Sequence, residues 1–476
     1  MRLSPLQVLS SDEIAAIHAA TLDILEDTGV VVHDRGLRER LRERGAATAD
    51  GSPCVRFPRA LVEDMIARTP PSFEVCDRDG KPAFVLGDGT PRVAAGHNAV
   101  FWLDGDTGET RPSRVADVEL FARLCQQLPA IDVLGIPVMP QDVPVPTNSL
   151  VHGVAACVSR CSKPIYFSTD NPEVSRRCLE VLAAAFGGNP GPRGYAVNQI
   201  SPTSPLYWEE TVCTILQECV AQDVPLAILP EPIAGISAPY TLAGLLTMNN
   251  AECLSGIVMI QMLKPGARAL YASSWTTADM RSGAALVGSV ETSVCRIAAA
   301  QLAEFYRLPS HTTAPNSDNH AHDEQNAWEK TLSQFCALAA GHDLIVNCGM
   351  FATGMTCSHE QLIMDAEMTM LARRLADGVR VDADSIAAGL MREIGPQGLT
   401  YLTTEHTMRW LHSGEHHQPL IAVRGPFAAW KAAGMPDAVA QAREQVVRMR
   451  EDRSGDLDER RAAVVREAVA RADATV

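Results

Sequence analysis

The sequence predicts an α/β protein: a closed (β/α)8 TIM barrel with an N-terminal extension of helices and a β-hairpin and with a C-terminal helical extension. From residue 98 onward, a short apolar β-rich run followed by an amphipathic helical stretch recurs roughly every 30–40 residues, as expected for βα units. Eight such pairs favour a closed barrel over an open sheet. No GxGxxG motif follows any of the runs, which also disfavours an open dinucleotide-binding sheet.

Each predicted strand is a short run of apolar and β-forming residues, and each predicted helix has apolar residues at helical spacing. The strands are expected at 99–103, 133–138, 164–168, 195–200, 226–229, 270–274, 310–314 and 344–347. The helices are expected at 115–128, 148–161, 172–186, 205–222, 241–263, 288–306, 323–340 and 359–377. The barrel is therefore expected to span residues 98–381.

The N-terminal extension, residues 1–97, is predicted to pack on the barrel. Ser10 and Glu13 stand at the spacing of a capping box before an apolar stripe, which predicts a helix over residues 10–27. Two more helices follow, and then two short strands around the turn Asp79-Gly80 predict a hairpin.

The C-terminal extension, residues 382–476, is predicted to be helical with loops. Its tail from Ala438 onward is rich in charged residues of both signs. A solvated surface helix explains this pattern, and a contact with an oligomer or a partner is the alternative.

The chain has 41 Lys and Arg against 57 Asp and Glu, so its net charge is 41 − 57 = −16. This balance argues against a nucleic-acid binder, whose footprint is basic, and against a docking surface for anionic lipids. The 13 cysteines include no CxxC pair and are expected to be reduced in a cytoplasmic protein. The apolar run 242–263 contains Asn249, Asn250 and Glu252, which predicts a buried helix rather than a membrane span.

Function in such barrels concentrates at the carboxyl ends of the strands. The loop after the seventh predicted strand contains Asn316, Asp318, His320 and His322. A purely structural interpretation also fits, with Asp318 or Asp323 capping the next helix and the histidines in water. The His-x-His spacing is one that metal ligands use, but the sequence offers no obvious third and fourth ligand.

Aromatic residues make up only 5% of the chain, so their positions are informative. Those at or near predicted strand ends are Trp102, Tyr166, Tyr195, Tyr240, Trp275 and Phe351. Around one mouth they would form a cage for a cation, especially a quaternary ammonium. The alternative is packing between strands and helices, which we expect for about half of them. Gln199 and Glu231 add polar groups at two further strand ends.

Two turns, at 200–206 and 235–244, each follow a strand and precede a helix. Ser204 and Thr241 are expected helix N-caps. The alternative is that exposed N–H groups of these turns hold a substrate carboxylate. The sequence contains no GxSxG, GxxxxGK[ST] or HExxH, so the usual signals of a nucleophile, a phosphate loop or a zinc protease are missing.

A series of short strings runs along nearly the whole chain, from residue 9 to about residue 450. They are ILEDTGV at 24–30, TGETRPS at 107–113, SKPIYFS at 162–168, APYTLAG at 238–244, NNAE at 249–252, Ser317-Asp318 with Asp323, Gln325 and Glu329, GPQG at 395–398, and Glu405-His406-Thr407. In combination they resemble the trimethylamine methyltransferase family, specifically its members that lack pyrrolysine and act on quaternary amines such as glycine betaine. The sequence has only the twenty standard residues, so pyrrolysine chemistry is not implied.

The resemblance implies a barrel that moves a methyl group from a quaternary or tertiary amine to the Co(I) corrinoid of a partner protein. The cobalamin-type corrinoid would belong to the partner, and we expect no tightly bound cofactor and no metal in this chain. We assign no catalytic residue, because Co(I) would be the nucleophile; Asp318, His320 and His322 would position the substrate. The expected substrate-binding residues are Trp102, Tyr166, Gln199, Glu231, Tyr240, Trp275, Asn316, Asp318, His320, His322 and Phe351.

A quaternary substrate fits this chemistry, since a methyl group leaves a fourfold-substituted nitrogen as a neutral amine and no general acid is needed. Two alternatives stay open: a metal-dependent hydrolase that uses His320 and His322, and a non-catalytic betaine-binding protein. We also expect a homo-oligomer with neither nucleic acid nor membrane as partner.

Overall fold

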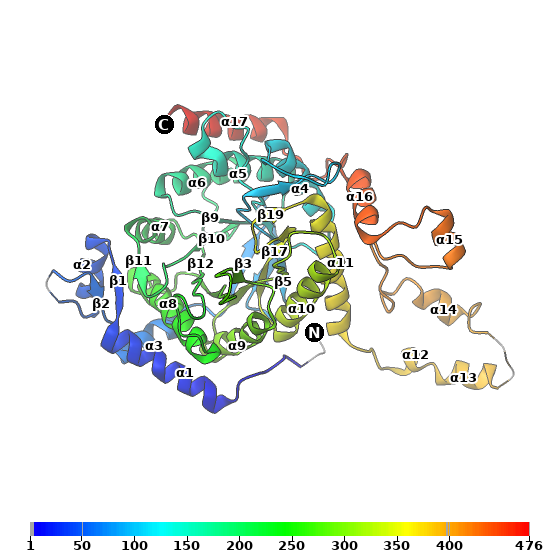
Figure 1. Ribbon diagram of the computed structural model, residues 1–476, viewed down its shortest axis with the longest axis horizontal. Helices are drawn as coiled ribbons and strands as arrows, with labels where there is room; N and C mark the ends of the chain where they lie inside the picture. The colour runs from blue at the N-terminus through cyan, green and yellow to red at the C-terminus, as the bar shows by residue number, and fades with distance from the viewer. Residues whose placement is uncertain (1–3, 50, 397, 399, 476) are drawn as a thin grey trace.

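The computed structural model describes residues 4–49, 51–396, 398 and 400–475. It confirms the predicted (β/α)8 barrel, in which a cylinder of parallel strands lies inside a ring of helices (Figure 1). The barrel strands are β5 (Arg92–Ala95), β8 (Leu134–Gly135), β9 (Ile165–Ser168), β10 (Ala196–Ile200), β12 (Leu226–Ile228), β13 (Ala269–Ser273), β16 (Ser310–Thr313) and β17 (Leu344–Cys348).

The cylinder is closed by hydrogen bonds around its circumference. The strands follow the order β5-β17-β16-β13-β12-β10-β9-β8, and neighbours are parallel. The seam between β5 and β8 is joined by a bridge between Ala94 and Val133. There the N–H of Ala95 donates to the carbonyl of Val133 at 3.0 Å.

The first barrel strand lies elsewhere than predicted. The barrel uses β5, whereas the predicted run at 99–103 contains β6 (Phe101–Leu103), which belongs to a separate sheet with β7 (Thr110–Arg111), β18 (Met350–Phe351) and β19 (Thr356–Cys357). The reason is local: the sequence of β6 is aromatic and typical of a strand, whereas β5 is short and rich in alanine. The barrel therefore begins at residue 92.

The eight predicted barrel helices are all present. They are α4 (Val115–Gln127), α5 (Ser149–Arg160), α6 (Pro172–Phe186), α7 (Glu210–Ala221), α8 (Leu242–Leu263), α9 (Val290–Tyr306), α10 (Glu324–Ala340) and α11 (His359–Asp377). Helix α6 shows how the sequence sets such bounds. The Asn171 side chain accepts from two N–H groups of the first turn, Pro172 begins the helix, and Gly187 ends it with φ at 86°.

Helix α8 is long and apolar enough to cross a membrane by length and composition. However, 78% of its apolar window is buried inside the protein, as in the core helix of a soluble protein. It packs against the barrel on one side and the N-terminal helices on the other, which agrees with the predicted buried helix.

The N-terminal extension covers α8. Helices α1 (Ser11–Asp23) and α3 (Arg59–Arg68) pack on it, and the predicted capping box between Ser10 and Glu13 is formed. Helix α2 (Arg35–Glu43) follows β1 (Val30–Val32), which pairs with β2 (Cys54–Val55) and with β11 (Tyr207–Trp208). Through β11 the extension supports the loop that precedes α7.

The predicted hairpin is also present and closes the end of the barrel at which the strands begin. It consists of β3 (Phe73–Cys76) and β4 (Pro82–Leu86). Phe73, Val75 and Leu86 form one apolar cluster with barrel-lining residues such as Ala94 and Val346. Burial of each large side chain there stabilises the fold by about 1.5–3 kcal/mol.

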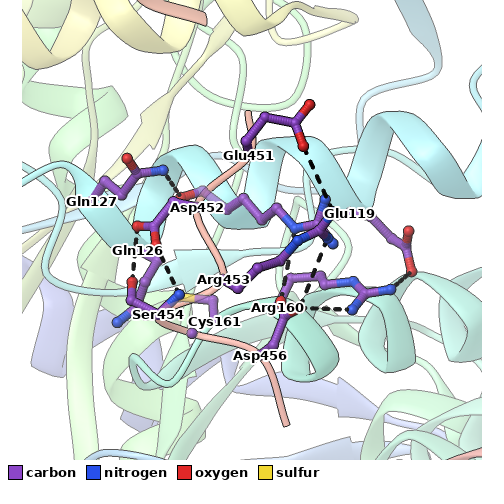
Figure 2. Close-up of polar contacts among 12 residues, drawn as sticks. Glu119, Gln126, Gln127, Arg160, Cys161, Glu451, Asp452, Arg453, Ser454 and Asp456 are labelled. Carbon is purple, nitrogen blue, oxygen red and sulfur yellow. Dashed lines mark hydrogen bonds and ion pairs between the residues drawn. The ribbon is translucent and has the colours of Figure 1, made fainter. Parts of the chain in front are cut away.

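The C-terminal tail is packed rather than solvated all round. Helix α16 (Ala438–Met449) lies on α11 and α4, and α17 (Glu459–Ala474) lies on α6 and α5 with Val465 and Ala468 buried. The linker between them is tied to the barrel by the contacts in Figure 2. Arg160 pairs with Asp456 of the linker at 3.2 Å and with Glu119 of α4 at 3.0 Å.

Between α11 and α16 the chain leaves the barrel as an arm, residues 378–437, which Figure 1 shows projecting away from the cylinder. It contains α12 (Ala383–Ile386), α13 (Ala388–Ile394), α14 (Glu405–Trp410) and α15 (Phe427–Ala432). Among its described residues, only Ile394 and Ile421 are buried.

The 13 cysteines are all free, as predicted. All but Cys54 are buried and pack as small apolar side chains. Burial raises the pKa of the Cys348 thiol far above its ordinary value, so this strand-end cysteine stays protonated at neutral pH.

Candidate functional site at the barrel mouth

A cavity of about 970 Å³ opens at the carboxyl ends of the barrel strands. Successive strands contribute to its wall: His97 and Asn98 follow β5, Asp170 follows β9, Gln199 lies in β10, Glu231 follows β12, Ser274 follows β13, Asn316 follows β16, and Asn347 lies in β17. Because active sites of this fold lie at this end of the barrel, the cavity is the candidate site.

Three carboxylates, those of Asp170, Glu209 and Glu231, belong to the wall of the cavity. Its described lining contains neither Lys nor Arg, and also no Phe, Tyr or Trp. All three side chains are exposed to the solvent of the open mouth. The site is therefore a negatively charged, largely polar bowl.

Local sequence places two of these carboxylates at the starts of helices. Asp170 directly precedes Asn171, the N-cap of α6, so the cap fixes its position. Glu209 is itself the N-cap residue of α7, but its side chain makes no capping hydrogen bond. Its position depends on β11, whose carbonyl at Trp208 accepts from the N–H of His33 at 3.0 Å.

Glu231 emerges from the barrel two residues after β12, beyond Leu229 and Pro230. Desolvation by the surrounding protein raises the pKa of Glu231 to about 7, and the negative charge of Asp170 adds to the rise. A hydrogen bond from the Ser274 hydroxyl acts in the opposite direction. Residue Glu231 as a whole is exposed at the open mouth, so solvent near it moderates the desolvation that raises this pKa.

A buried carboxylate holds one wall of the cavity in place. Glu252, fully buried on α8, accepts from the Leu206 N–H at 2.7 Å and from the Ser204 hydroxyl at 2.8 Å. Burial raises the pKa of Glu252 to about 7, while the two hydrogen bonds lower it. Glu252 therefore fixes the turn at 200–206 rather than contacting a substrate.

The two turns that could have held a substrate carboxylate use several of their N–H donors within the protein. Besides Leu206, the Thr203 N–H donates to the Tyr207 carbonyl at 2.8 Å, and the Gly235 N–H donates to the Ala238 carbonyl at 2.9 Å. Thr241 caps α8 as predicted, whereas Ser204 binds Glu252 instead of capping α7. The expected cap at Ser204 is wrong because α7 begins only at Glu210.

Aromatic and imidazole rings fill the barrel beneath the cavity. The Tyr166 hydroxyl donates to Gln199 at 2.7 Å, and its ring stacks on His311 with centroids 5.3 Å apart. The rings of His97 and Tyr166 meet edge to face, with their centroids 5.0 Å apart. Burial lowers the pKa of His97 to about 4 and that of His311 well below its ordinary value, so both are neutral at pH 7.

The loop after β16 is structural for the most part. Asp318 accepts from the N–H groups of Val287 at 2.7 Å and Gly288 at 3.1 Å, so it holds the neighbouring edge of the mouth. Burial raises the pKa of Asp318. Asn316 lines the cavity and accepts from the Asn347 amide at 2.8 Å.

A fully buried ion pair supports this wall from behind. Lys330 of α10 and Asp365 of α11 lie 3.1 Å apart. Lys330 also donates to the carbonyls of Pro315 and Met350, and Asp365 accepts from the Gly349 N–H at 2.6 Å. The pair thus ties together the two loops that follow β16 and β17. Burial raises the pKa of Asp365 to about 6.

Of the eleven residues predicted to bind the substrate, Gln199, Glu231 and Asn316 line the cavity. Their role toward a substrate stays a prediction. Tyr166 lies one layer deeper, and Asp318 lies behind the rim.

The expected aromatic cage is not assembled. Trp102 is buried against His359, with ring centroids 4.5 Å apart. Trp275 is buried as well, and its indole N–H donates to the Thr292 carbonyl at 3.4 Å. Tyr240 is exposed but does not line the cavity. Trp102 and Trp275 pack where burial removes apolar surface from water, between strands and helices.

The two histidines of the predicted loop do not converge on a common point in the cavity. His320 is exposed, and neither residue lines the cavity. His322 lies 4.9 Å from the ring of Phe351 and 3.3 Å from the Ser358 hydroxyl, and burial lowers its pKa to about 4. Among the described residues, no group of three or more His, Cys, Asp or Glu is placed to hold a metal. The hydrolase alternative therefore finds no support in the geometry.

Most residues of the wall were not among the predicted substrate-binding residues, and His97, Asn98, Asp170 and Glu209 are the most informative of those left out. The first two directly follow the true first strand, which the prediction placed later. Asp170 follows a correctly predicted strand, and its acidic side chain at the strand end was the available signal. For Glu209 the signal was an acidic residue just before a helix.

Comparisons with known proteins agree with the fold. A family model described as trimethylamine methyltransferase (MTTB) matches residues 1–476. A trimethylamine methyltransferase MttB of Desulfitobacterium hafniense is 30% identical over 464 residues, covering 97% of this chain and 92% of that protein. A glycine betaine methyltransferase of D. hafniense strain Y51 is 28% identical over 427 residues, covering 89% and 88%.

Among solved structures, the monomethylamine methyltransferase MtmB of Methanosarcina barkeri is similar in fold, with a TM-score of 0.55 at 12% identity and coverage of 94% of this chain and 89% of MtmB. Since the family model spans the whole sequence and the relatives align over most of their length, this chain belongs to the trimethylamine methyltransferase family of methyl-transferring enzymes.

Proposed function

We propose that this chain transfers a methyl group from a cationic methylated amine to the Co(I) corrinoid of a partner protein. The amine, either quaternary or protonated tertiary, binds in the mouth with one methyl group directed outward. One observation carries the proposal: three carboxylates and no Lys or Arg line the described wall of the cavity.

The charge of the mouth selects cations. Two unit charges about 5 Å apart interact by about 1–3 kcal/mol when the effective dielectric constant lies between 20 and 80. Asp170, Glu209 and the ionised form of Glu231 each attract a cation by an amount in this range, and each repels an anion by a similar amount. Binding is therefore electrostatic, without the aromatic cage that the sequence suggested.

The wall also suits the chemistry of the leaving group. A quaternary nitrogen leaves as a neutral tertiary amine, so no proton has to be supplied. A neutral tertiary amine has to be protonated before a methyl group can depart. Glu231, whose pKa is raised to about 7, gains or loses a proton at its carboxyl oxygen near neutral pH, and the neighbouring carboxylates favour the protonated amine.

The lining favours amines that lack a carboxylate. Glycine betaine carries one, whereas trimethylamine does not. The described wall offers no Lys or Arg to pair with it, His320 and His322 lie outside the cavity, and the N–H groups of Thr203, Leu206 and Gly235 are bonded within the protein. We therefore propose that trimethylamine-like or choline-like cations are used in preference to glycine betaine.

A reduced corrinoid, carried by the partner, supplies the nucleophile. Cobalamin has a phosphate in its tail, and among the described residues of the cavity lining there is no Lys or Arg to bind it. This supports the proposal that the partner, not this chain, holds the corrinoid. The residues of this chain bind the cation, direct one methyl group toward the opening and exclude water once the mouth is covered.

The test is incubation of the purified protein with free cob(I)alamin and trimethylamine, tetramethylammonium, choline or glycine betaine, with the absorbance of methylated cobalamin as readout. We expect turnover with at least one carboxylate-free cation, and turnover of glycine betaine at least about 5-fold lower, because its carboxylate is repelled by roughly 1 kcal/mol or more. Absence of turnover with every amine while cobalt stays reduced would overturn the proposal. Amine binding without demethylation would indicate a non-catalytic binding protein instead.

A further inference from the structure

We propose that Asn347 is a specificity-determining residue, which selects cationic amines that also carry a hydrogen-bond donor, either a hydroxyl group or an N–H. The side-chain oxygen of Asn347, Oδ1, accepts that hydrogen bond. The inference rests on the proposed function in taking a cationic amine as the ligand of the mouth, and it adds the chemical feature by which one such cation is preferred to another.

A β-bulge directs the Asn347 side chain into the cavity. In β17, Leu344 and Val346 belong to the apolar cluster inside the barrel. Ile345 packs on the outer side of the strand, so regular alternation would turn residue 347 outward as well. However, the pairing with β5 shifts between Val346 and Cys348, which makes residue 347 an extra one, and Asn347 lines the cavity. Bulges beside active sites re-aim side chains in this way.

The backbone at this bulge favours a residue other than asparagine. The φ angle of Asn347 is 144°, in the region where glycine is at ease and residues with a Cβ are strained. Such residues persist where the surrounding structure holds them, and they cluster at ligand-binding sites. Glycine would avoid the cost, so the amide side chain, which glycine lacks, is the group that this position provides.

Hydrogen bonds fix which end of the Asn347 amide is left for a ligand. The Asn316 Nδ2 donates to the backbone carbonyl of Thr313 at 3.1 Å, and a backbone carbonyl can only accept. The Asn316 Oδ1 therefore faces Asn347 and accepts from its Nδ2 at 2.8 Å. Because the nitrogen of the Asn347 amide is committed to Asn316, its oxygen is the atom that remains.

The same series of hydrogen bonds continues to Glu231. The Thr313 hydroxyl lies 3.3 Å from the Asn316 Nδ2 and 3.3 Å from the Ser274 hydroxyl, and Ser274 donates to the Glu231 carboxylate. Asn347, Asn316, Thr313, Ser274 and Glu231 all line the cavity, at the ends of the neighbouring strands β17, β16, β13 and β12. Since an amide NH2 stands at one end and a carboxylate at the other, every donor points toward Glu231. A flipped Asn347 amide would bring two oxygens together.

The Asn347 oxygen is open to a ligand. No hydrogen bond among the described residues uses it, and it is not among the polar atoms that the protein encloses without a partner. A ligand that covers this acceptor without a donor removes its water and replaces it with nothing, which weakens binding. A ligand O–H or N–H replaces that water. Of two cations of equal size and charge, the one with a donor therefore binds more tightly.

Titration calorimetry of the full chain with choline and with propyltrimethylammonium tests the inference. The two cations have the same permanent charge and nearly the same size, and a hydroxyl group in one replaces a methyl group in the other. At about pH 8, above the pKa of Glu231, we expect the Kd for choline to be at least about 5-fold lower. The hydrophobic effect favours the propyl compound, so it cannot produce this preference.

Asn347→Gly removes the amide and suits the positive φ of this position. In this variant the two Kd values should differ by less than about 2-fold. The matched control is Ala352→Gly, because Ala352 also has a positive φ, 52°, and follows the same strand but does not line the cavity. The control should keep the wild-type preference. Circular dichroism and thermal unfolding check that both variants are folded.

Equal affinity of the wild type for the two cations overturns the inference, even if the variant does not fold, and so does a lack of binding by both. A preference for choline that survives in folded Asn347→Gly also overturns it. Methyl transfer to free cob(I)alamin is measured separately. A choline preference that depends on Asn347, without turnover of either cation, supports this inference and overturns the proposed function.

Discussion

Replacement of Glu231 by Gln removes one negative charge from the mouth and preserves the shape of the side chain. We expect the KM for a quaternary amine to rise, because the cation loses one of its three carboxylate neighbours. At a pH above about 7, where Glu231 is ionised, an attraction of about 1–3 kcal/mol corresponds to a rise of roughly 5- to 150-fold.

The pH dependence should change in a defined direction. The pKa of Glu231 is raised to about 7, so the attractive, ionised form accumulates as the pH rises through neutrality. In the wild type, the KM for tetramethylammonium should therefore fall as the pH increases from about 6 to about 8. The variant should lose this change, because a Gln side chain does not ionise.

Initial rates of methyl transfer to free cob(I)alamin over this pH range provide the assay, and tetramethylammonium is the right substrate since its charge does not titrate. Glu210→Gln is the matched control, because Glu210 stands on α7 beside the mouth but does not line the cavity. If Glu231→Gln keeps the wild-type KM and the wild-type pH profile, the cation is not held where we place it.

Three further changes test groups behind the cavity. Lys330→Met leaves Asp365 buried without its partner, so the free energy of unfolding in denaturant should fall by about 3–5 kcal/mol; replacement of both residues by apolar ones should restore most of it. Trp275→Ala should cost about 3–5 kcal/mol of stability with little effect on KM; a lower amine affinity at unchanged stability would return Trp275 to the binding site. Glu252, with its pKa raised from 4.5 to about 7, contributes stability that is complete below pH 4.5 and is lost as the pH rises through 7. Glu252→Gln should flatten this part of the profile of Tm against pH in calorimetry, and an unchanged slope would contradict the assignment.

The helices of the extension and of the barrel follow from local signals. The capping box at Ser10 and the Asn171-Pro172 start of α6 act within one turn of the chain, and the structure contains both. Strand β5 was missed because its identity depends on pairing with β17 and β8, which lie far away in the sequence. Local strand propensity pointed instead to Phe101–Leu103.

The candidate site was predictable only where a strand was predicted correctly. Glu231 and Asn316 follow strands that the pattern found, and both line the cavity. The prediction of an aromatic cage was wrong because a position near a strand end does not determine which way a ring points. Tyr166 points into the barrel interior, whereas Trp275 packs against α9.

The β3–β4 hairpin affects the order in which substrate and products bind and leave. It closes the end of the barrel opposite the cavity, so the amine and its product enter and leave through the mouth at the carboxyl ends of the strands. If the proposed reaction is correct, the amine has to enter before the corrinoid carrier covers the mouth, and the demethylated amine stays in the cavity until the carrier dissociates. A segment that never touches the amine thereby makes the kinetics sequential.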